Sequence, residues 1–377
     1  MKKLFYSLYA LFFNLSRVFP IKQNRIAFVA PHNGGTEDSL SILRSYVENK
    51  GGYETVFIST NDLKLDFSGF MPLIKSCLKT AGFFTFKAAA LARSKYVFLN
   101  DNFMPMASLK FSKEAVITQL WHAEGAFKKF GLSAPLTDDV REREKRCSAR
   151  LDYVICTSKS VAPVYAEAFG VNIEKVLSLG SPRNDLLLGK KDAERIRAEF
   201  DKAHPECAGK KLILYAPTFR DSPEKDSKLL ESIDTEAFNR EFPDCRLLTK
   251  LHPQINSAKP LDGATDVTKG HNIGDLTLIC DTVITDYSSV CMDFALLSKP
   301  CVFYAFDLAE YEIERSFYFD YKNYVPGPVA EDFESLIKAL KNADEHKEKL
   351  KKFVDFNFDF VDGKNSERIY NKVILNK

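Results

Sequence analysis

The chain has 377 residues, of which 45% are hydrophobic and 28% are charged, and its formal net charge is +2. This length suits two domains better than one, and the composition is ordinary for a globular protein. A net charge so close to zero excludes a polybasic nucleic-acid-binding protein. Charge is nevertheless uneven, because residues 71–100 carry five basic residues and no acid. A basic stretch of this kind suits anionic lipid headgroups or phosphates.

The first 19 residues are strongly apolar and aromatic. This stretch is shorter than the roughly 20 residues that a membrane-spanning helix needs. Lys3, Ser7, Ala10, Asn14 and Arg17 fall on one narrow helical stripe. We therefore predict that residues 1–20 form an amphipathic helix on an anionic membrane surface, which would place the protein peripherally on the cytoplasmic face of the cell membrane. The alternative is a helix docked on the protein's own core.

From residue 25 onward, apolar strand-like runs alternate with helix-like segments. This alternation is typical of α/β proteins with parallel sheets. It divides into a first domain over residues 21–189, a second domain over residues 190–355, and a helical tail over residues 356–377 that could pack back on the first domain. We expect two Rossmann-like, doubly wound domains with a ligand-binding cleft between them.

One strand–turn–helix–strand unit spans residues 283–302. Its turn carries Asp286, Ser288 and Ser289 at the start of the expected helix. Hydroxyls and backbone N–H groups at a helix N-terminus favour a phosphate. The alternative is an ordinary serine cap on an α/β unit.

Two further strands of the first domain are followed by chemically active residues. His122 closes one strand, ahead of a loop that carries Lys128, and this place suits a general base. A single histidine is more often structural. Ser181 and Arg183 follow another strand, where Arg183 could bind phosphate. The alternative there is a turn that caps the next helix.

The second domain repeats this arrangement at two strand ends. Thr218 and Arg220 follow its first strand, and an arginine can hold phosphate oxygens with two parallel hydrogen bonds. Lys250 and His252 follow the next strand and share one side of an extended chain. Two cationic or protic side chains on one side suit the binding of a pyrophosphate. The alternative for each residue is that it simply lies in solvent at the end of a strand.

Other familiar signatures are missing from the sequence. It contains no P-loop, no convincing dinucleotide fingerprint and no clustered metal-ligand motif. None of its eight cysteines forms a C-x-x-C pair, which favours a protein with reduced thiols. We therefore expect no cofactor and no metal, and phosphates held by hydroxyls, cations and a helix dipole.

Taken together, these motifs resemble the CDP-glycerol glycerophosphotransferase family of teichoic-acid and related polymer enzymes. The resemblance covers roughly residues 116–329. Its matching segments are Gln119-Leu120-Trp121-His122, Lys128-Lys129-Phe130-Gly131, Gly180-Ser181-Pro182-Arg183-Asn184-Asp185, Tyr215-Ala216-Pro217-Thr218, Lys250-Leu251-His252-Pro253, Ile284-Thr285-Asp286-Tyr287-Ser288-Ser289, Asp293-Phe294, Lys299-Pro300, and Phe317-Tyr318-Phe319-Asp320 with Pro326-Gly327-Pro328. Ala123 and Glu124 stand where the family often has Gly and Thr.

The resemblance implies a GT-B fold, with the nucleotide in the C-terminal domain and the acceptor near the N-terminal one. It also implies transfer of glycerol phosphate from CDP-glycerol to a hydroxyl of a membrane-bound, polyprenyl-diphosphate-linked acceptor, with release of CMP. On this reading His122 is the general base, and His252 acts with Lys250 and the two serines on the donor pyrophosphate.

Three alternatives stay open. The donor could be CDP-ribitol or another CDP-alditol, the protein could be a GT-B glycosyltransferase that uses a nucleotide sugar, or it could be a membrane-bound scaffold without activity. The sequence also leaves open whether the chain forms a homo-oligomer.

Overall fold

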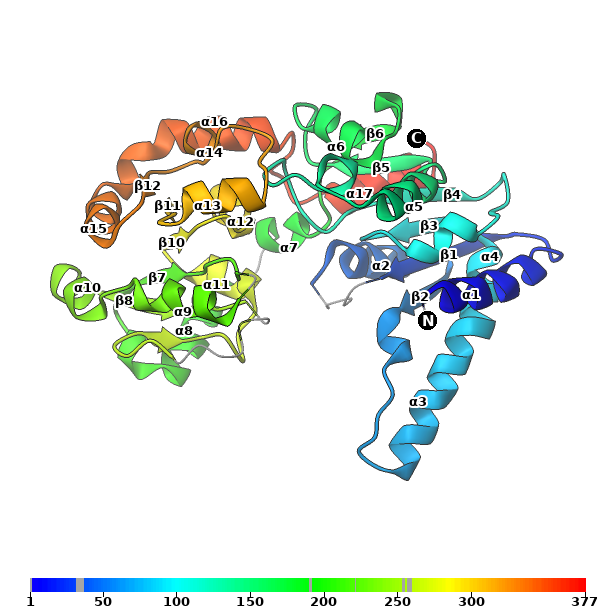
Figure 1. Cartoon of the computed structure of the whole chain (residues 1–377), viewed down its shortest axis with the longest axis horizontal. Coiled ribbons are helices and arrows are strands. Elements are labelled where there is room, and N and C mark those ends of the chain that lie inside the picture. Colours follow the sequence, from blue (N-terminus) through cyan, green and yellow to red (C-terminus); the bar gives the residue numbers. More distant parts are fainter. Residues whose placement is uncertain (1, 32–36, 190–191, 221, 253–254, 256–259) are drawn as a thin grey trace. The chain divides into compact units, whose positions relative to one another are not determined.

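A computed structural model describes residues 2–31, 37–189, 192–220, 222–252, 255 and 260–377. The chain folds into two compact units. Unit 1 comprises Met1–Gly125, Phe130–Asp185 and Asp362–Lys377, and unit 2 comprises Ala126–Lys129 and Leu186–Val361. Each unit is built around a parallel sheet of six strands (Figure 1).

The sheet of unit 1 has the strand order β2-β1-β3-β4-β5-β6. Its strands are β1 (Lys22–Ala30), β2 (Glu54–Ser59), β3 (Ser94–Leu99), β4 (Val116–Gln119), β5 (Tyr153–Cys156) and β6 (Val176–Ser178). Its helices are α1 (Lys2–Ser16), α2 (Ser39–Lys50), α3 (Phe70–Gly82), α4 (Ala88–Ala92), α5 (Asp138–Ser148), α6 (Ala162–Phe169) and α17 (Asn365–Ile369). Strands that are buried on both faces explain the continuous apolar runs in the sequence.

The sheet of unit 2 has the order β12-β11-β10-β7-β8-β9. Its strands are β7 (Lys211–Tyr215), β8 (Cys245–Thr249), β9 (Thr265–Asp266), β10 (Thr282–Thr285), β11 (Cys301–Tyr304) and β12 (Val329–Ala330). Its helices are α8 (Ala193–Ala203), α9 (Pro223–Glu231), α10 (Thr235–Glu241), α11 (Ile273–Ile279), α12 (Val290–Leu296), α13 (Leu308–Glu314), α14 (Tyr321–Tyr324), α15 (Phe333–Lys341) and α16 (Lys347–Asn357). Helix α7 (Asn184–Leu188) spans the division between the units.

Both sheets have a point at which the strand order reverses. In unit 1 it lies between β1 and β3, and in unit 2 it lies between β7 and β10. Open parallel sheets bind ligands outside the carboxyl ends of strands at such points. The loops after β3, β7 and β10 are therefore the first places to look for function.

The end of the chain returns to unit 1. Ile369, Tyr370, Val373 and Ile374 are buried in the core beneath β1 and β3. The Tyr96 hydroxyl of β3 donates to the carbonyl of Ile374 at 2.9 Å. The last crossing between the units falls after Val361, later than the expected boundary at residue 355, because α16 packs in the core of unit 2.

Helix α1 is present, but its polar and apolar residues do not divide as expected. Tyr9, Ala10 and Phe13 are buried against unit 1, whereas Leu11 and Leu15 are exposed. Ala10 was expected on the polar stripe. The helix is therefore docked on the protein's own core, and its membrane-surface role stays a prediction.

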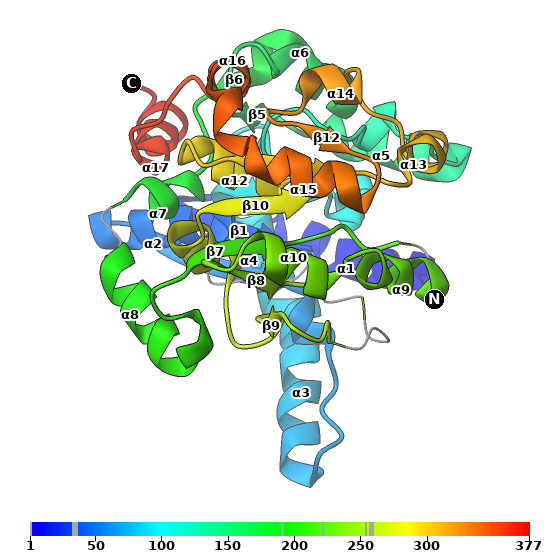
Figure 2. The same ribbon diagram turned by 90° about the vertical axis from the view of Figure 1, so that its left-hand side faces the viewer.

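Helix α3 runs away from the rest of unit 1 in both views (Figures 1 and 2). The preceding loop folds back along it, because the N–H of Asp66 donates to the Ser76 hydroxyl at 3.0 Å. Among the described residues, no helix combines the length and the hydropathy that a membrane span requires.

Candidate functional site

His122 is presented by a strained turn directly after β4. Trp121 has a φ of 60°, a left-handed conformation that residues other than glycine rarely adopt. Such a conformation costs of order 1–3 kcal/mol. The turn is held because the N–H of Trp121 donates to the Gln119 side chain at 3.0 Å. The indole packs on the imidazole with ring centroids 4.2 Å apart. The His122 side chain is thereby held in place while 53% of it stays exposed.

A carboxylate from the neighbouring strand meets this imidazole. Asp101 follows β3, and its Oδ2 lies 3.2 Å from Nδ1 of His122. Its Oδ1 accepts the N–H of Asn102 at 2.6 Å. Sequence reasoning missed Asp101. The sequence did offer one signal, because Asp101 lies two residues after the end of β3 and β3 is the strand before β4 in the sequence.

The predicted phosphate loop at Ser181 and Arg183 has a structural role. The Ser181 hydroxyl lies 2.9 Å from that of Ser39, and its carbonyl accepts from Asn365 at 3.0 Å. The Asp185 carboxylate accepts the N–H groups of Asn365 and Ser366, both at 2.8 Å. This loop therefore anchors the returning C-terminal segment. Arg183 is half-buried, and a contact with phosphate stays a prediction.

Glu124, two residues after His122, is buried and has a partner in Asn184, the first residue of α7. In the orientation that satisfies both groups, the Asn184 amide donates to the two carboxylate oxygens at 2.9 and 2.7 Å. Glu124 is only 5% exposed. A buried carboxylate needs such partners, so this departure from the usual motif is accommodated inside unit 1.

Lys128 belongs to unit 2, although it lies only six residues after His122. It forms an antiparallel bridge with Phe317, and the N–H of Lys129 donates to the carbonyl of Ser316 at 2.9 Å. Burial lowers the pKa of the Lys128 ammonium, and this exceeds the opposing effect of the Asp286 charge. An anion beside Lys128 would therefore be favoured, since it would relieve the cost of the buried charge.

A small pocket opens beside Lys128 within unit 2. It has a volume of about 40 Å³, which is room for a few waters and not for a whole nucleotide. The Thr218 hydroxyl is buried and has no hydrogen-bond partner among the described residues. Besides Lys128 and Thr218, the lining residues are Phe219, Arg220, Tyr311, Glu314 and Arg315. The pocket therefore combines cations with an unused hydroxyl at the reversal point of the sheet.

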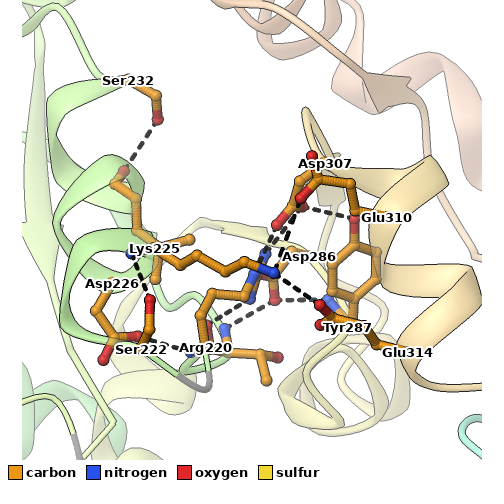
Figure 3. A network of polar contacts seen from close by, with 12 residues as sticks. Arg220, Ser222, Lys225, Asp226, Ser232, Asp286, Tyr287, Asp307, Glu310 and Glu314 are labelled. Carbon is orange, nitrogen blue, oxygen red and sulfur yellow. Dashed lines mark hydrogen bonds and ion pairs between the residues drawn. The ribbon is translucent and has the colours of Figure 1, made fainter.

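Arg220 lines this pocket, but its guanidinium is engaged by protein groups (Figure 3). Its Nε donates to Asp307 Oδ2 at 2.7 Å, and one Nη lies 2.9 Å from Asp286 Oδ2. The group also lies over the rings of Tyr287 and Tyr311, 5.1 and 5.2 Å from their centroids. These contacts join the β7 and β10 loops to Asp307, and contact of Arg220 with a donor phosphate stays a prediction.

Asp286 is part of the same network. Its Oδ1 accepts the N–H of Thr218 at 2.8 Å and that of Tyr287 at 2.5 Å. Only 1% of the residue is exposed. Asp286 thus fixes the loops that form the pocket, and its direct contact with a ligand stays a prediction.

Lys250 and His252 contact different parts of unit 2. The Lys250 ammonium donates to the carbonyls of Val267, Thr268 and His271 at 3.4, 3.3 and 2.7 Å. The His252 ring packs on Phe219, with centroids 4.7 Å apart. Burial lowers the pKa of His252, and the charge of Lys128 lowers it further. His252 therefore belongs beside the pocket, whereas Lys250 secures the segment after β9.

Ser288 and Ser289 lie at the start of α12, as the sequence predicted. The Ser288 hydroxyl accepts the N–H of Val290 at 3.3 Å, which makes it a local cap. Ser289 is exposed and makes no side-chain cap. Their contact with a donor phosphate stays a prediction.

Comparison with known proteins identifies the relatives of this chain. Residues 11–375 match the family described as CDP-Glycerol:Poly(glycerophosphate) glycerophosphotransferase. A teichoic acid poly(ribitol-phosphate) polymerase from Bacillus spizizenii is 31% identical over 99% of this chain and 60% of its own length. A teichoic acid glycerol-phosphate primase from Bacillus subtilis is 31% identical over 76% of this chain and 75% of its own length. The chain thus spans about three fifths of the first of these relatives.

The structure of a variant of the wall teichoic acid polymerase TagF superposes with a TM-score of 0.79 at 25% identity, over 98% of this chain and 92% of that one. This similarity confirms the expected GT-B-like fold. The chain belongs to the CDP-glycerol:poly(glycerophosphate) glycerophosphotransferase family.

Proposed function

We propose that this protein transfers an alditol phosphate from a CDP-alditol to an acceptor hydroxyl and releases CMP. The observation that carries the proposal is the presentation of His122. Strain at Trp121 and contact with Asp101 hold an exposed imidazole at the carboxyl edge of the unit 1 sheet. Backbone strain at such an edge is expected where a reactive group must be held.

In the proposed reaction, the acceptor hydroxyl gives its proton to Nε2 of His122. Its oxygen forms a bond to the alditol-bearing phosphorus. The bond between that phosphorus and the bridging oxygen breaks, and CMP leaves with the electron pair. His122 thus acts as general base. Phosphoryl transfers also require stabilisation of charge on the phosphate oxygens.

We assign that stabilisation to the pocket of unit 2. Lys128 supplies a half-buried cation and Thr218 an unused hydroxyl, and both line this pocket. His252, Ser288 and Ser289 complete the proposed donor contacts. Arg220 and Asp286 hold the loops around this pocket, and we keep both as candidate donor contacts.

Glycerol phosphate is the group that the sequence resemblance implies, and ribitol phosphate is the alternative. The relatives carry names of both kinds. The direct test measures CMP release from CDP-glycerol, CDP-ribitol and, as the glycosyltransferase control, UDP-sugars, with a lipid-linked saccharide acceptor. Release from one CDP-alditol supports the proposal and fixes the donor. Turnover of a UDP-sugar without CMP release from either CDP-alditol would overturn it.

We further propose that the protein reaches a polyprenyl-diphosphate-linked acceptor at an anionic membrane through the α3 surface. This surface comprises the exposed apolar side chains of Leu65, Phe67, Phe70, Met71, Ile74 and Leu78. Phe67 and Phe70 are 77% and 76% exposed, and Lys75 and Lys79 lie exposed on α3 between them and the sheet. Apolar side chains with flanking lysines suit the interface of an anionic bilayer.

A further inference from the structure

The Asp101–His122 pair lies at the ends of two adjacent parallel strands. β3 and β4 pair in register from Tyr96 and Val116 to Leu99 and Gln119. The N–H of Leu120 continues the ladder by donating to the carbonyl of Leu99 at 2.7 Å. Asp101 and His122 therefore leave the same edge of the sheet within a few residues of the last paired position.

The carboxylate is itself held in place. Its side chain is only 16% exposed, its Oδ1 accepts the N–H of Asn102 at 2.6 Å, and its Oδ2 faces the imidazole. Glu144 of α5 lies near enough for the charge of Asp101 to add to the effect of burial in raising the Glu144 pKa. A carboxylate held by the backbone on one oxygen is a rigid hydrogen-bond acceptor on the other.

The geometry assigns Asp101 as the positioning residue for the His122 general base, an inference that rests on the proposed function. An ionised carboxylate can only accept hydrogen bonds. A contact of 3.2 Å between this carboxylate and Nδ1 of a neutral imidazole is therefore favourable when Nδ1 carries the proton. The lone pair is then on Nε2, the nitrogen that takes the acceptor proton. The same carboxylate stabilises the imidazolium that forms during the reaction.

The packing of Trp121 completes the restraint. The indole covers one face of the imidazole, with an angle of 36° between the rings. The indole is in turn fixed by Phe130 and Phe169, with centroids 5.0 and 5.2 Å from its own. Trp121 therefore sets the plane of the His122 imidazole. Asp101 sets the rotation of the ring within that plane and selects its tautomer.

The first test needs no activity. Nitrogen-15 NMR of the neutral imidazole, assigned by comparison with H122N, reports which ring nitrogen carries the proton. We expect the Nδ1–H tautomer in the wild-type protein and a mixture with the Nε2–H form in D101N. A wild-type imidazole with its proton on Nε2 would overturn the inference, whether or not the protein turns over a CDP-alditol.

The second test is kinetic. D101N should lower kcat by at least about 100-fold, since loss of the comparable carboxylate in serine proteases costs about 10⁴, and should leave KM for the CDP-alditol within about twofold. E114Q, which removes an exposed carboxylate of the same unit, is the matched control and should keep wild-type kcat. Folded D101N with wild-type kcat would overturn the inference. Wild-type protein that shows the Nδ1–H tautomer but no turnover would count against the proposed function alone.

Discussion

The guanidinium of Arg220 and the carboxylate of Asp286 lie 2.9 Å apart, with only 3% and 2% of their side chains exposed. Asp307 provides a second partner, and its pKa is lowered because Arg220 and Tyr287 outweigh the effect of burial. The loops after β7 and β10 are therefore joined by a buried ion-pair network that shapes the pocket beside Lys128.

Removing the arginine should destabilise unit 2. R220M leaves two carboxylates without their cation, and breaking a buried pair in this way costs about 3–5 kcal/mol. The free energy of unfolding from urea titrations measures this loss. K225M, which removes a more exposed lysine paired with Glu314, is the control and should change it little. Wild-type stability of R220M combined with lost donor binding would instead place Arg220 on the substrate.

Binding of the donor should be linked to a proton on Lys128. Burial lowers the pKa of this lysine in the free protein, and a bound pyrophosphate would raise it. At pH values between the Lys128 pKa of the free protein and that of the complex, the complex therefore binds more protons than the free protein. Affinity for the donor should fall with rising pH in this range, by at most about tenfold per pH unit.

Calorimetric titration of CDP-glycerol in two buffers of different ionisation enthalpy, at alkaline pH, should show this proton uptake. K128M should abolish the uptake, whereas K129M, which changes the exposed neighbouring lysine, should retain it. Equal uptake in K128M and in the wild type would exclude Lys128 as the linked group.

Lys250 and His252 should respond differently to substitution. K250M leaves three backbone carbonyls without the ammonium that they share, and should lower stability by about 1–3 kcal/mol. H252N should leave the free energy of unfolding nearly unchanged and reduce turnover. Both quantities can be measured on the same preparations, and loss of turnover in K250M at wild-type stability would contradict the assignment.

The α3 surface should carry membrane binding. F67S/F70S removes two exposed phenylalanines, each worth about 1.5–3 kcal/mol when fully buried, and should weaken sedimentation with anionic liposomes by at least tenfold. I313S, which changes an apolar residue of unit 2 that is 87% exposed, is the matched control. Unchanged binding of F67S/F70S would leave the exposed leucines of α1 as the alternative surface. Deleting the first 19 residues would be less informative, because Tyr9 and Phe13 are core residues.

Sequence reasoning predicted the parallel α/β architecture because buried parallel strands read as continuous apolar runs separated by helical patterns. It also predicted that His122, Thr218 and Ser288 follow strands. It could not predict which polar side chains form hydrogen bonds or ion pairs with other parts of the protein. Arg220 and Lys250 have the residue type and the place of phosphate ligands, but carboxylates and carbonyls distant in sequence occupy their donors. The partner of His122 was missed for the same reason, because it comes from the neighbouring strand.

The most direct test of the account compares wild-type protein with H122N for two quantities, donor binding and CMP release from the CDP-alditol that the wild type uses. His122 acts on the acceptor proton, so H122N should bind the donor with wild-type affinity and release CMP at least about 100-fold more slowly, in line with the usual contribution of a general base. Wild-type CMP release by folded H122N would contradict the account.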